Sequence, residues 1–453
     1  MNRAALRRPI LFLASAASLA LVACSSEGGS PDVAPWSKNL HTSQGNVVAA
    51  TSAEGEIALA GWFIKSAHLG GDLLKAKDDF DQQTYFGRLD AEGTARWTAT
   101  GGHDQESIYG VAFDSFGGTL ATGSFGGEID LGLGTITALS QDTFLARFDE
   151  VGNTSWVRHF SADLGGPSGF GSSTVLAGVA ATGDGGAVIA GSFTGTLGFG
   201  GAPLDAVEEG TFIARLGAAG EHLWSRTLGG TNNDATAVAI DPEGSVLVLG
   251  ATNSGQVDPA PAPGGAGFYD SAAYLVKLGP DGSVRWGTRI ASDASGGYVY
   301  ALALATDAAG NVIVGGVATG VVSVGKSTLD TDLGGTVPFA AMFSPEGKGR
   351  WITKLDVTSS DVASVVVDEQ GHIYVAATTS VGGVDPIASI FRLDSEGQAT
   401  RQWKLGERSS TITSMKALGT DLLIGGTFLG SIDLGGDELR SESGDVFLAR
   451  FRP

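Results

Sequence analysis

The stretch YFGRLDAEGTARW at residues 85–97 decides the fold, because versions of it recur along most of the chain. It joins an apolar segment with an aromatic and a basic residue to a glycine turn and then to a tryptophan. Such a run precedes six of the eight tryptophans, and a seventh tryptophan stands near the start: Trp97, Trp156, Trp224, Trp286, Trp351, Trp403 and Trp36. They recur about every 60 residues, which indicates a repeat architecture.

Each repeat contains four strand signals, which we name A to D in chain order. Strand A is short and apolar, strand B is rich in Leu or β-branched residues, strand C carries the aromatic and basic residues, and strand D carries the tryptophan. Turns such as 114–117 and 241–244 follow strand A, where Asp starts the turn and Gly supplies a positive φ. No long stretch has a strong helical period, so the sequence predicts an all-β fold.

The two ends of the chain complete each other. FLARFRP at 447–453 supplies strand C of a seventh unit and then stops, whereas PWSKNL at 35–40 supplies an isolated strand D. An N-terminal strand that pairs with the C-terminal blade closes a ring and removes the exposed sheet edges. We therefore predict one seven-bladed β-propeller of four-stranded blades over residues 36–453.

The repeat resembles the SBBP-type β-propeller repeat of bacterial secreted and surface proteins. That pattern has the aromatic-x-x-basic-Leu-Asp-x-x-Gly-x-x-x-Trp run, then Gly-Gly and an apolar-Asp-x-x-Gly turn, which residues 229–250 match well. The resemblance implies a fold and leaves the function open. The family often has Asp two residues before the strand C aromatic, and only Asp142 and Asp445 match here.

The N-terminus has the features of a targeting segment. Three arginines precede an uncharged run from residue 10 to residue 23, which is too short to span a membrane. The run ends in LVAC at 21–24, which resembles the bacterial lipobox. The resemblance implies a signal peptide at 1–23, lipidation of Cys24 and a flexible tether at 24–35. Because Ser25 replaces the Asp that retains many such lipoproteins, we expect anchoring in the outer membrane.

Composition excludes several classes of function. The net charge is −21, which argues against nucleic-acid binding through phosphates. One Cys permits no intrachain disulfide and no CxxC pair, and the six His form no HExxH motif. There is no GxSxG elbow and no P-loop. We expect no cofactor, no metal site and no nucleic-acid partner.

The repeated residues have structural interpretations. We expect the tryptophans to pack blades together, with ligand stacking as the alternative. The basic residues of strand C recur in six of seven blades, which favours ion pairing between blades; Met342 occupies the remaining position. The Asp-x-x-Gly segments lack the alternating oxygen ligands of a calcium loop, so we interpret them as turns.

Two functions stay open. Our main hypothesis is a non-catalytic binding or scaffold module of the bacterial envelope. Under this hypothesis the chain is not an enzyme. The alternative is a polysaccharide hydrolase or lyase with its site at the propeller mouth. Two carboxylates about 5–10 Å apart in a deep pocket would favour the enzyme.

The face that carries the B–C and D–A connections, here called the long-loop face, is the predicted working face. Its connections are long and differ between blades, whereas the A–B and C–D turns of the opposite, short-turn face are short. Besides Cys24 for lipidation, the ligand-binding candidates are Asp104, Glu106, Asp234, Asp270, Asp293 and Asp361. Because the chain is acidic, we expect a protein or glycan partner there and the membrane through the anchor.

Overall fold

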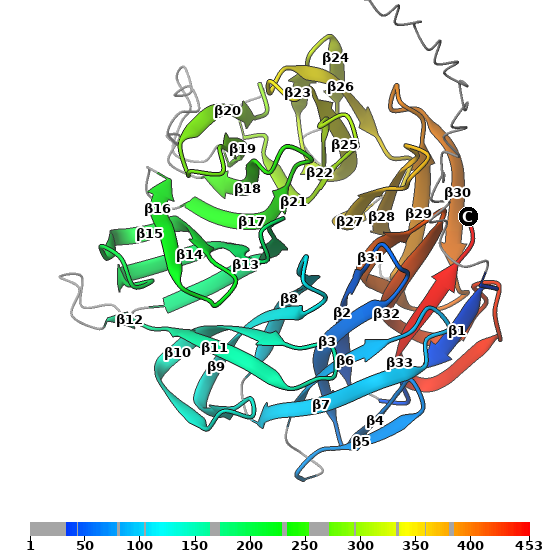
Figure 1. The fold of residues 1–453 in the computed structure, drawn as a ribbon. Helices are drawn as coiled ribbons and strands as arrows, with labels where there is room; N and C mark the ends of the chain where they lie inside the picture. Colours follow the sequence, from blue (N-terminus) through cyan, green and yellow to red (C-terminus); the bar gives the residue numbers. More distant parts are fainter. Residues whose placement is uncertain are drawn as a thin grey trace, which may run out of the picture.

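The computed structural model describes residues 33–42, 44–78, 82–103, 106–163, 173–228, 233–252, 271–293, 296–331, 335–357, 359–379 and 385–453. Within these ranges the regular elements are β-strands. Seven antiparallel sheets are arranged around a central axis, and two further sheets have only two strands each (Figure 1). The described residues include no helix that is long and apolar enough to cross a membrane. The predicted all-β, seven-bladed propeller is confirmed.

Each blade has four strands that run from the axis outward. Blade 1 contains β2 (Gly45–Thr51), β3 (Ile57–Ile64), β6 (Gln82–Leu89) and β7 (Ala95–His103); blade 2 contains β8 (Ser107–Phe113), β9 (Thr119–Asp130), β10 (Thr135–Phe148) and β11 (Thr154–Phe160); blade 3 contains β13 (Ser173–Ala181), β14 (Ala187–Leu197), β15 (Leu204–Leu216) and β16 (His222–Leu228). Blade 4 contains β17 (Asn233–Ile240), β18 (Val246–Thr252), β19 (Ala272–Leu278) and β20 (Val284–Ile290); blade 5 contains β21 (Val299–Thr306), β22 (Val312–Ala318), β25 (Val337–Phe343) and β26 (Gly349–Lys354). Blade 6 contains β27 (Ser359–Val367), β28 (Ile373–Thr379), β29 (Ile387–Leu393) and β30 (Ala399–Leu405); blade 7 contains β31 (Ser410–Leu418), β32 (Asp421–Ile432), β33 (Leu439–Phe451) and β1 (Trp36–Asn39). Short additional strands are β4 (Ser66–Leu69) with β5 (Asp72–Lys75), β12 (Ala162–Asp163), and β23 (Val321–Val324) with β24 (Ser327–Asp330).

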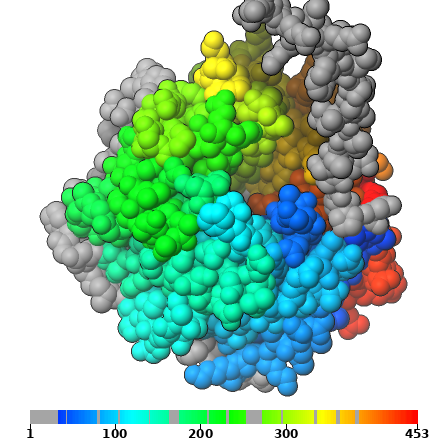
Figure 2. Space-filling model, viewed as in Figure 1, coloured from blue at the N-terminus to red at the C-terminus, as the bar shows by residue number. Residues whose placement is uncertain are grey.

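The N-terminal strand closes the ring. β1 pairs with β33 in the register Trp36↔Arg450 to Asn39↔Phe447, and the backbone N–H of Leu40 extends the ladder by donating to Val446 at 2.9 Å. In the space-filling view the blue start and the red end of the described chain lie side by side (Figure 2). The outer edge of blade 7 is therefore a paired strand, as the complementary ends predict.

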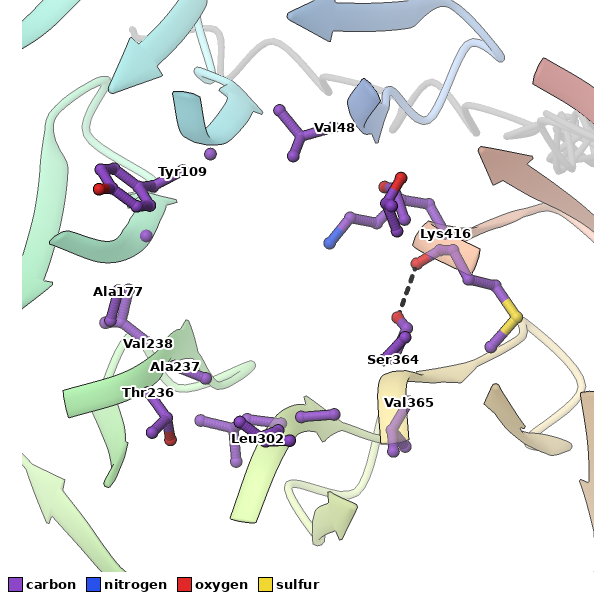
Figure 3. Close-up of a pocket in the computed structure, with 18 of the residues that line it drawn as sticks. Val48, Tyr109, Ala177, Thr236, Ala237, Val238, Leu302, Ser364, Val365 and Lys416 are labelled. Atoms are coloured by element: carbon purple, nitrogen blue, oxygen red, sulfur yellow. Dashed lines mark hydrogen bonds between the residues drawn. The ribbon is translucent and has the colours of Figure 1, made fainter. Parts of the chain in front are cut away.

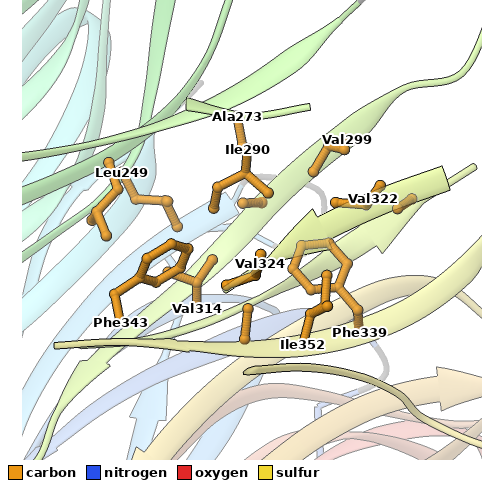
Figure 4. Close-up of a cluster of buried hydrophobic side chains, with 14 of the residues drawn as sticks. Leu249, Ala273, Ile290, Val299, Val314, Val322, Val324, Phe339, Phe343 and Ile352 are labelled. Carbon is orange, nitrogen blue, oxygen red and sulfur yellow. The ribbon is translucent and has the colours of Figure 1, made fainter. Parts of the chain in front are cut away.

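The hydrophobic core consists of layers between neighbouring blades. The layer between blades 4 and 5 contains Leu249, Ala273 and Ile290 on one side and Val314, Phe339 and Phe343 on the other (Figure 4). Because both faces of a middle strand are covered by neighbouring blades, β18, β19 and β22 are buried at every position. This burial accounts for the continuous apolar runs of strands B and C.

Each repeated tryptophan but one packs against the C–D turn of the next blade. Trp156 donates its Nε1–H to the carbonyl of Ala218 at 2.9 Å, and a side-chain carbon on Gly220 would lie 3.0 Å from Cε3 of the same indole. Gly220 also has a φ of +74°, so the turn needs glycine for two reasons. The other indole–glycine pairs are Trp36–Gly93, Trp97–Gly152, Trp224–Gly282, Trp286–Gly347 and Trp351–Gly397. The blade-packing prediction is confirmed for these six.

Trp403 departs from this arrangement. In blade 6 the residue opposite the strand C base Arg392 is Arg401, whereas Trp403 pairs with Ile390. Blade 7 has no C–D turn, because its fourth strand comes from the N-terminus, so no turn is present to receive an indole. The Arg401 guanidinium instead lies 4.6 Å from the Trp403 ring centroid. Trp403 still packs between blades, because its ring lies edge-on at 5.7 Å from that of Phe451 in blade 7. The blade-packing prediction therefore holds for Trp403 as well, and only the contact with a turn differs.

In five blades the strand C base forms an ion pair with an acid of its own blade, which corrects the prediction of ion pairing between blades. Arg147 pairs with Asp114 of the A–B turn in its own blade at 2.5 Å, and Lys277 pairs with Asp241 in the same way at 2.6 Å. The other ion pairs are Arg88–Glu56, Arg215–Asp184 and Arg450–Asp421, whereas Arg392 of blade 6 hydrogen-bonds with His372, which in turn contacts Asp368. In blade 5, where Met342 replaces the base, Asn311 donates to Asp307 at 2.6 Å instead.

The Asp-x-x-Gly segments are turns, as predicted. In the A–B turn of blade 2, Asp114 Oδ1 accepts the backbone N–H groups of Phe116 and Gly118, each at 2.8 Å. The long B–C connections differ from expectation in blades 2, 3 and 7, where the two strands continue beyond the blade as two-stranded ribbons. In blade 2 the extension alternates polar and apolar residues and ends in a second turn, where Asp130 accepts a hydrogen bond from the backbone N–H of Gly132 at 2.8 Å. Both features favour a ribbon over a loop.

Candidate functional site

The structure describes four of the six predicted ligand-binding residues. Glu106, Asp234 and Asp293 are described in full, and Asp361 contributes a backbone position in β27 only. Asp104, Asp270 and the lipidation candidate Cys24 lie outside the described residues. The described candidates belong to different blades of the long-loop face and do not form one cluster.

Glu106 is buried between blades 1 and 2, where it supports the structure. Only 1% of its surface is exposed, and the hydroxyl of Thr84 from blade 1 donates a hydrogen bond to its carboxylate. The side-chain amide of Gln82 donates to the Glu106 backbone carbonyl. Because Glu106 is enclosed between blades 1 and 2, this arrangement links the blades and leaves no carboxylate surface for a ligand. Asp293, in contrast, is exposed, and its backbone N–H donates to Val321 at 2.7 Å.

Asp234 belongs to a pair of carboxyl groups between blades 3 and 4. It lies at the start of β17, the inner strand of blade 4, and hydrogen-bonds with Glu209 of β15 in blade 3. Asp234 Oδ1 is buried and accepts no hydrogen bond from a backbone or other side-chain donor among the described residues. Because both groups are carboxyls, the hydrogen bond between Glu209 and Asp234 requires that one of them carries a proton.

The surroundings of Glu209 keep that proton in place near neutral pH. Burial of the carboxyl, the charge of Asp234 and the hydrogen bond to Asp234 raise the pKa of Glu209 to about 7, while a hydrogen bond from Ser192 acts in the opposite direction. Two carboxylates in direct contact cannot both be ionised without strong repulsion. Glu209 is nevertheless exposed at its surface, so a substrate can reach it.

Neighbouring hydroxyl groups fix the position of the pair. Tyr274 of β19 donates to the backbone carbonyl of Asp234 at 3.1 Å, and its hydroxyl lies 2.8 Å from that of Thr211. Thr211 also donates to the carbonyl of Asn233 at 3.1 Å. Burial raises the pKa of Tyr274, so its hydroxyl stays protonated and acts as a donor. The start of β17 is thus held by the blade 3 and blade 4 strands that carry Glu209 and Tyr274.

A second polar group lies at the same face in blade 2. His159 Nε2 is 2.7 Å from Asp142 Oδ2, and the Ser161 hydroxyl donates to Asp142 Oδ1 at 3.1 Å. Both side chains contact the aspartate, whereas a nucleophilic triad needs the histidine between the serine and the acid. Asp142 is also completely buried. This group therefore fixes the end of the blade and does not supply an activated nucleophile.

A hollow lies on the short-turn face, opposite the predicted working face. It measures about 720 Å³ and is lined by A–B turns of blades 1 to 3. Two of its four acids, Glu56 and Asp114, are ion-paired with Arg88 and Arg147. The described residues include no group of three or more His, Cys, Asp or Glu side chains arranged to hold a metal ion.

Sequence reasoning missed Glu209. Its neighbour in the chain is another glutamate, and nothing in the repeat marks either of them, whereas Asp234 was predicted as an acidic residue of the long-loop face. The contact joins residues of two different blades, so only the packing of β15 against β17 brings them together. The sequence signal that could have found Glu209 is its place three residues before the strand C aromatic Phe212.

Comparisons with known proteins support the propeller at the level of the fold. No family model matches the chain, so the resemblance to SBBP-type repeats is not supported beyond a β-propeller. An uncharacterized WD repeat-containing protein of Acanthamoeba polyphaga mimivirus is 27% identical over 159 residues, which is 31% of this chain and 11% of that protein. The match thus spans a small part of the curated relative.

Several solved structures have a similar shape at low sequence identity. They include a putative gluconolactonase (12% identity, 93% of this chain and 94% of the other, TM-score 0.36), polysaccharide lyase Uly1 (10%, 89% and 89%, 0.48) and a Hadza microbial sialidase (10%, 85% and 75%, 0.43). At these values the likeness concerns the fold alone.

These names correct the prediction that the chain is not an enzyme. That prediction took the propeller, with its few recognisable catalytic motifs, as evidence for a binding module. Structures of this shape carry the names of gluconolactonases, a polysaccharide lyase and a sialidase, so the architecture gives no support to a non-enzyme. The reason for the error is that propeller sites are assembled from different blades and leave no local motif.

Proposed function

We propose that the protein is a carbohydrate-active enzyme that cleaves a polysaccharide at the long-loop face, with the Glu209–Asp234 pair as its acid–base group. The observation that carries the proposal is the hydrogen bond between the exposed carboxyl of Glu209 and Asp234, a contact that helps to raise the pKa of Glu209 to about 7. Protonation of the departing glycosidic oxygen is the step that this group can perform. We favour hydrolysis of an uncharged glycan, because a net charge of −21 disfavours an anionic polymer.

The pair acts as one unit in this reaction. In glycosidases with two separate roles the carboxyl groups stand about 5–10 Å apart, whereas here they share a hydrogen bond. Glu209 donates its proton to the glycosidic oxygen as the bond to the anomeric carbon breaks. The two carboxylates that remain repel each other, and this repulsion favours recovery of a proton from the water that attacks the anomeric carbon. Atoms and charge then balance over one turnover.

The test is release of reducing ends from a panel of soluble uncharged polysaccharides by the purified chain. We expect Glu209→Gln and Asp234→Asn to lower the rate by 100-fold or more, in the range of general acid catalysis. Glu128→Gln, a change at an exposed residue of β9 on the same face, is the matched control and should retain the wild-type rate. The wild-type rate should fall as the pH rises through about 7, because Glu209 then loses its proton. Equal rates in wild type, E209Q and D234N would reject the proposal.

We further propose that the enzyme is held at the bacterial outer membrane by lipid on Cys24. The support is the sequence LVAC at 21–24, its position after the uncharged run and the serine that follows. Several acyl chains on one residue provide stable attachment. A Cys24→Ser variant expressed in a bacterial host should move from the membrane fraction to the soluble fraction and lose incorporation of labelled palmitate. Wild-type protein that carries no label would exclude the anchor.

A further inference from the structure

The A–B turn of blade 2 departs from the repeat. In blades 1 to 6 this turn is closed by a backbone hydrogen bond from its fourth residue to its first, as from Gly117 to Asp114 at 3.2 Å. The third residue is Phe116 in blade 2, whereas it is polar or Ala in the other five blades: Glu54, Asp184, Glu243, Ala309 and Gln370. The turn therefore forms equally well without a large apolar side chain at this position.

The C–D turn of blade 2 departs from the repeat as well. Its second and third residues are Glu150 and Val151. The equivalent residues in blades 1 and 3 to 6 are Ala91–Glu92, Ala218–Ala219, Pro280–Asp281, Pro345–Glu346 and Ser395–Glu396. Blade 2 thus has an acid where the other blades have a small residue or Pro, and a valine where they have an acid or Ala. Neither residue is required for the fold of the turn.

These three side chains form one surface, here called the blade 2 patch (Phe116, Glu150 and Val151). Phe116 is 60% exposed and Val151 is 71% exposed. The Glu150 carboxylate lies against the A–B turn, because a side-chain carbon on Gly117 would be 2.6 Å from Glu150 Oε1. The Phe116 ring reaches the A–B turn of blade 3, where a side-chain carbon on Gly185 would overlap it. The patch is therefore continuous across both turns of blade 2.

The backbone beneath the patch is held in place from two blades. Asp114 Oδ1 accepts the backbone N–H groups of Phe116 and Gly118, each at 2.8 Å. The Arg88 guanidinium of blade 1 donates to the carbonyl of Gly117 at 2.6 Å. An exposed aromatic side chain on a fixed backbone loses little conformational freedom when a partner covers it. This is a property of the residues that dominate binding at protein interfaces.

The hollow of about 720 Å³ on the short-turn face adjoins the patch, because Gly117 and Glu150 belong to its lining. Glu54 and Glu150 are exposed acids of this lining, and neither belongs to an ion pair among the described residues. Arg88, the basic residue of the lining, is already paired with Glu56. The hollow therefore presents negative charge beside exposed apolar side chains.

The axial channel is a separate space. It is lined by the inner strands of all seven blades, and Lys416 extends from β31 toward its centre (Figure 3). The channel and the hollow share no lining residue. The charge of the hollow is therefore set by the turns of blades 1 and 2.

We propose that the blade 2 patch and the adjoining hollow dock a basic segment of another protein. Apolar side chains of the segment cover Phe116 and Val151, while its Lys or Arg side chains approach Glu54 and Glu150. Carboxylates without a paired base attract such a segment and orient it as it approaches. A second copy of this chain carries the same acids, and an anionic bilayer has the same sign of charge, so both are disfavoured. The docking surface lies opposite the long-loop face and is independent of the carboxyl pair there.

The test is the fluorescence anisotropy of labelled peptides titrated with the purified chain. The probe is KLKLKLK, which alternates basic and apolar residues, and the comparison peptides are ELELELE and KGKGKGK. We expect KLKLKLK to bind with saturation, KGKGKGK to bind about tenfold more weakly, and ELELELE not to bind. Raising NaCl from about 50 to 300 mM should weaken the binding of KLKLKLK, because salt screens exposed charges.

Substitutions taken from the other blades locate the binding. Phe116→Gln introduces the residue of blade 6, Val151→Ala that of blade 3 and Glu150→Ser that of blade 6, so we expect all three variants to keep the wild-type melting temperature. The affinity for KLKLKLK should fall about tenfold in Phe116→Gln and about threefold in each of the other two. Glu346→Gln removes an acid from the equivalent turn of blade 5 and is the matched control, which should keep the wild-type affinity.

Three results would overturn the proposal. The first is the lack of saturable binding of KLKLKLK to the wild type. The second is equal affinity of the wild type and Phe116→Gln, which would show that the peptide binds through charge alone. The third is an equal loss of affinity in Glu346→Gln and Glu150→Ser, which would show that the acids of the short-turn face attract the peptide without a defined site.

Discussion

Removal of the closing strand tests the architecture most directly. We compare a chain that begins at His41, which lacks β1 and Leu40, with a chain that begins at Val33 and keeps them. β1 contributes four register pairs to β33, a buried Leu40 with 2% exposure, and the Trp36 indole, whose Nε1–H donates to Ala91 at 2.9 Å. Without these residues, β33 becomes the unpaired edge of blade 7.

The size of the effect follows from these contacts. Burial of Leu40 contributes about 2 kcal/mol and the half-buried indole of Trp36 another ~2 kcal/mol. The hydrogen bonds of the strand contribute about 1 kcal/mol each, and they approximately offset the backbone entropy of about 1–2 kcal/mol per ordered residue. The net loss is therefore about 4 kcal/mol. With an unfolding entropy of about 2.1 cal/mol/K per residue, the melting temperature of a chain of this length falls by roughly 5 °C.

The assay is urea denaturation followed by tryptophan fluorescence, together with light scattering after size-exclusion chromatography. The chain beginning at His41 should unfold at lower urea and self-associate through the exposed edge of β33, whereas the chain beginning at Val33 should stay monomeric. Trp36→Ala and Leu40→Ala should each reproduce about half of the loss in the free energy of unfolding. If the chain beginning at His41 has the same midpoint and remains monomeric, the closing strand does not stabilise the ring.

Two further predictions concern the turns and the carboxyl pair. Gly282→Ala should destabilise the fold more than Gly371→Ala in chemical denaturation: both positions have positive φ, at a cost of about 1 kcal/mol, but only the new carbon at residue 282 would lie 2.9 Å from Cδ2 of Trp224. Equal losses would show that the indole contact is unimportant. Because the pKa of Glu209 is raised to about 7 in the folded state, the fold binds more protons than the unfolded chain between about pH 4.5 and 7, and stability contributed by the pair is lost as the pH rises through that window. Glu209→Gln should therefore gain in melting temperature relative to wild type from pH 5 to pH 8, and a constant difference would contradict the assigned pKa.

The sequence by itself determined the blade count, the strand order and the ring closure. These features repeat along the chain. The pattern seen at Arg147, Gly152 and Trp156 occurs in most blades because each of these blades packs against its neighbours with the same geometry. The complementary ends at 35–40 and 447–453 predicted closure, since a paired edge is more stable than an exposed one. The turns at 114–117 and 241–244 were predicted because an Asp side chain and a positive φ act over a few residues.

The tertiary structure alone decided the site. Glu209 and Asp234 are in different blades, and the channel around Lys416 forms where seven inner strands converge, so neither leaves a local pattern in the chain. The shifted position of Trp403, in contrast, is already visible in the sequence, because Trp403 lies six residues after Gly397 and the tryptophans at 97, 156, 224, 286 and 351 lie four residues after their glycines. Local spacing encodes backbone geometry over a few residues, whereas pKa shifts and cavities depend on the burial and charge that distant segments create when they pack together.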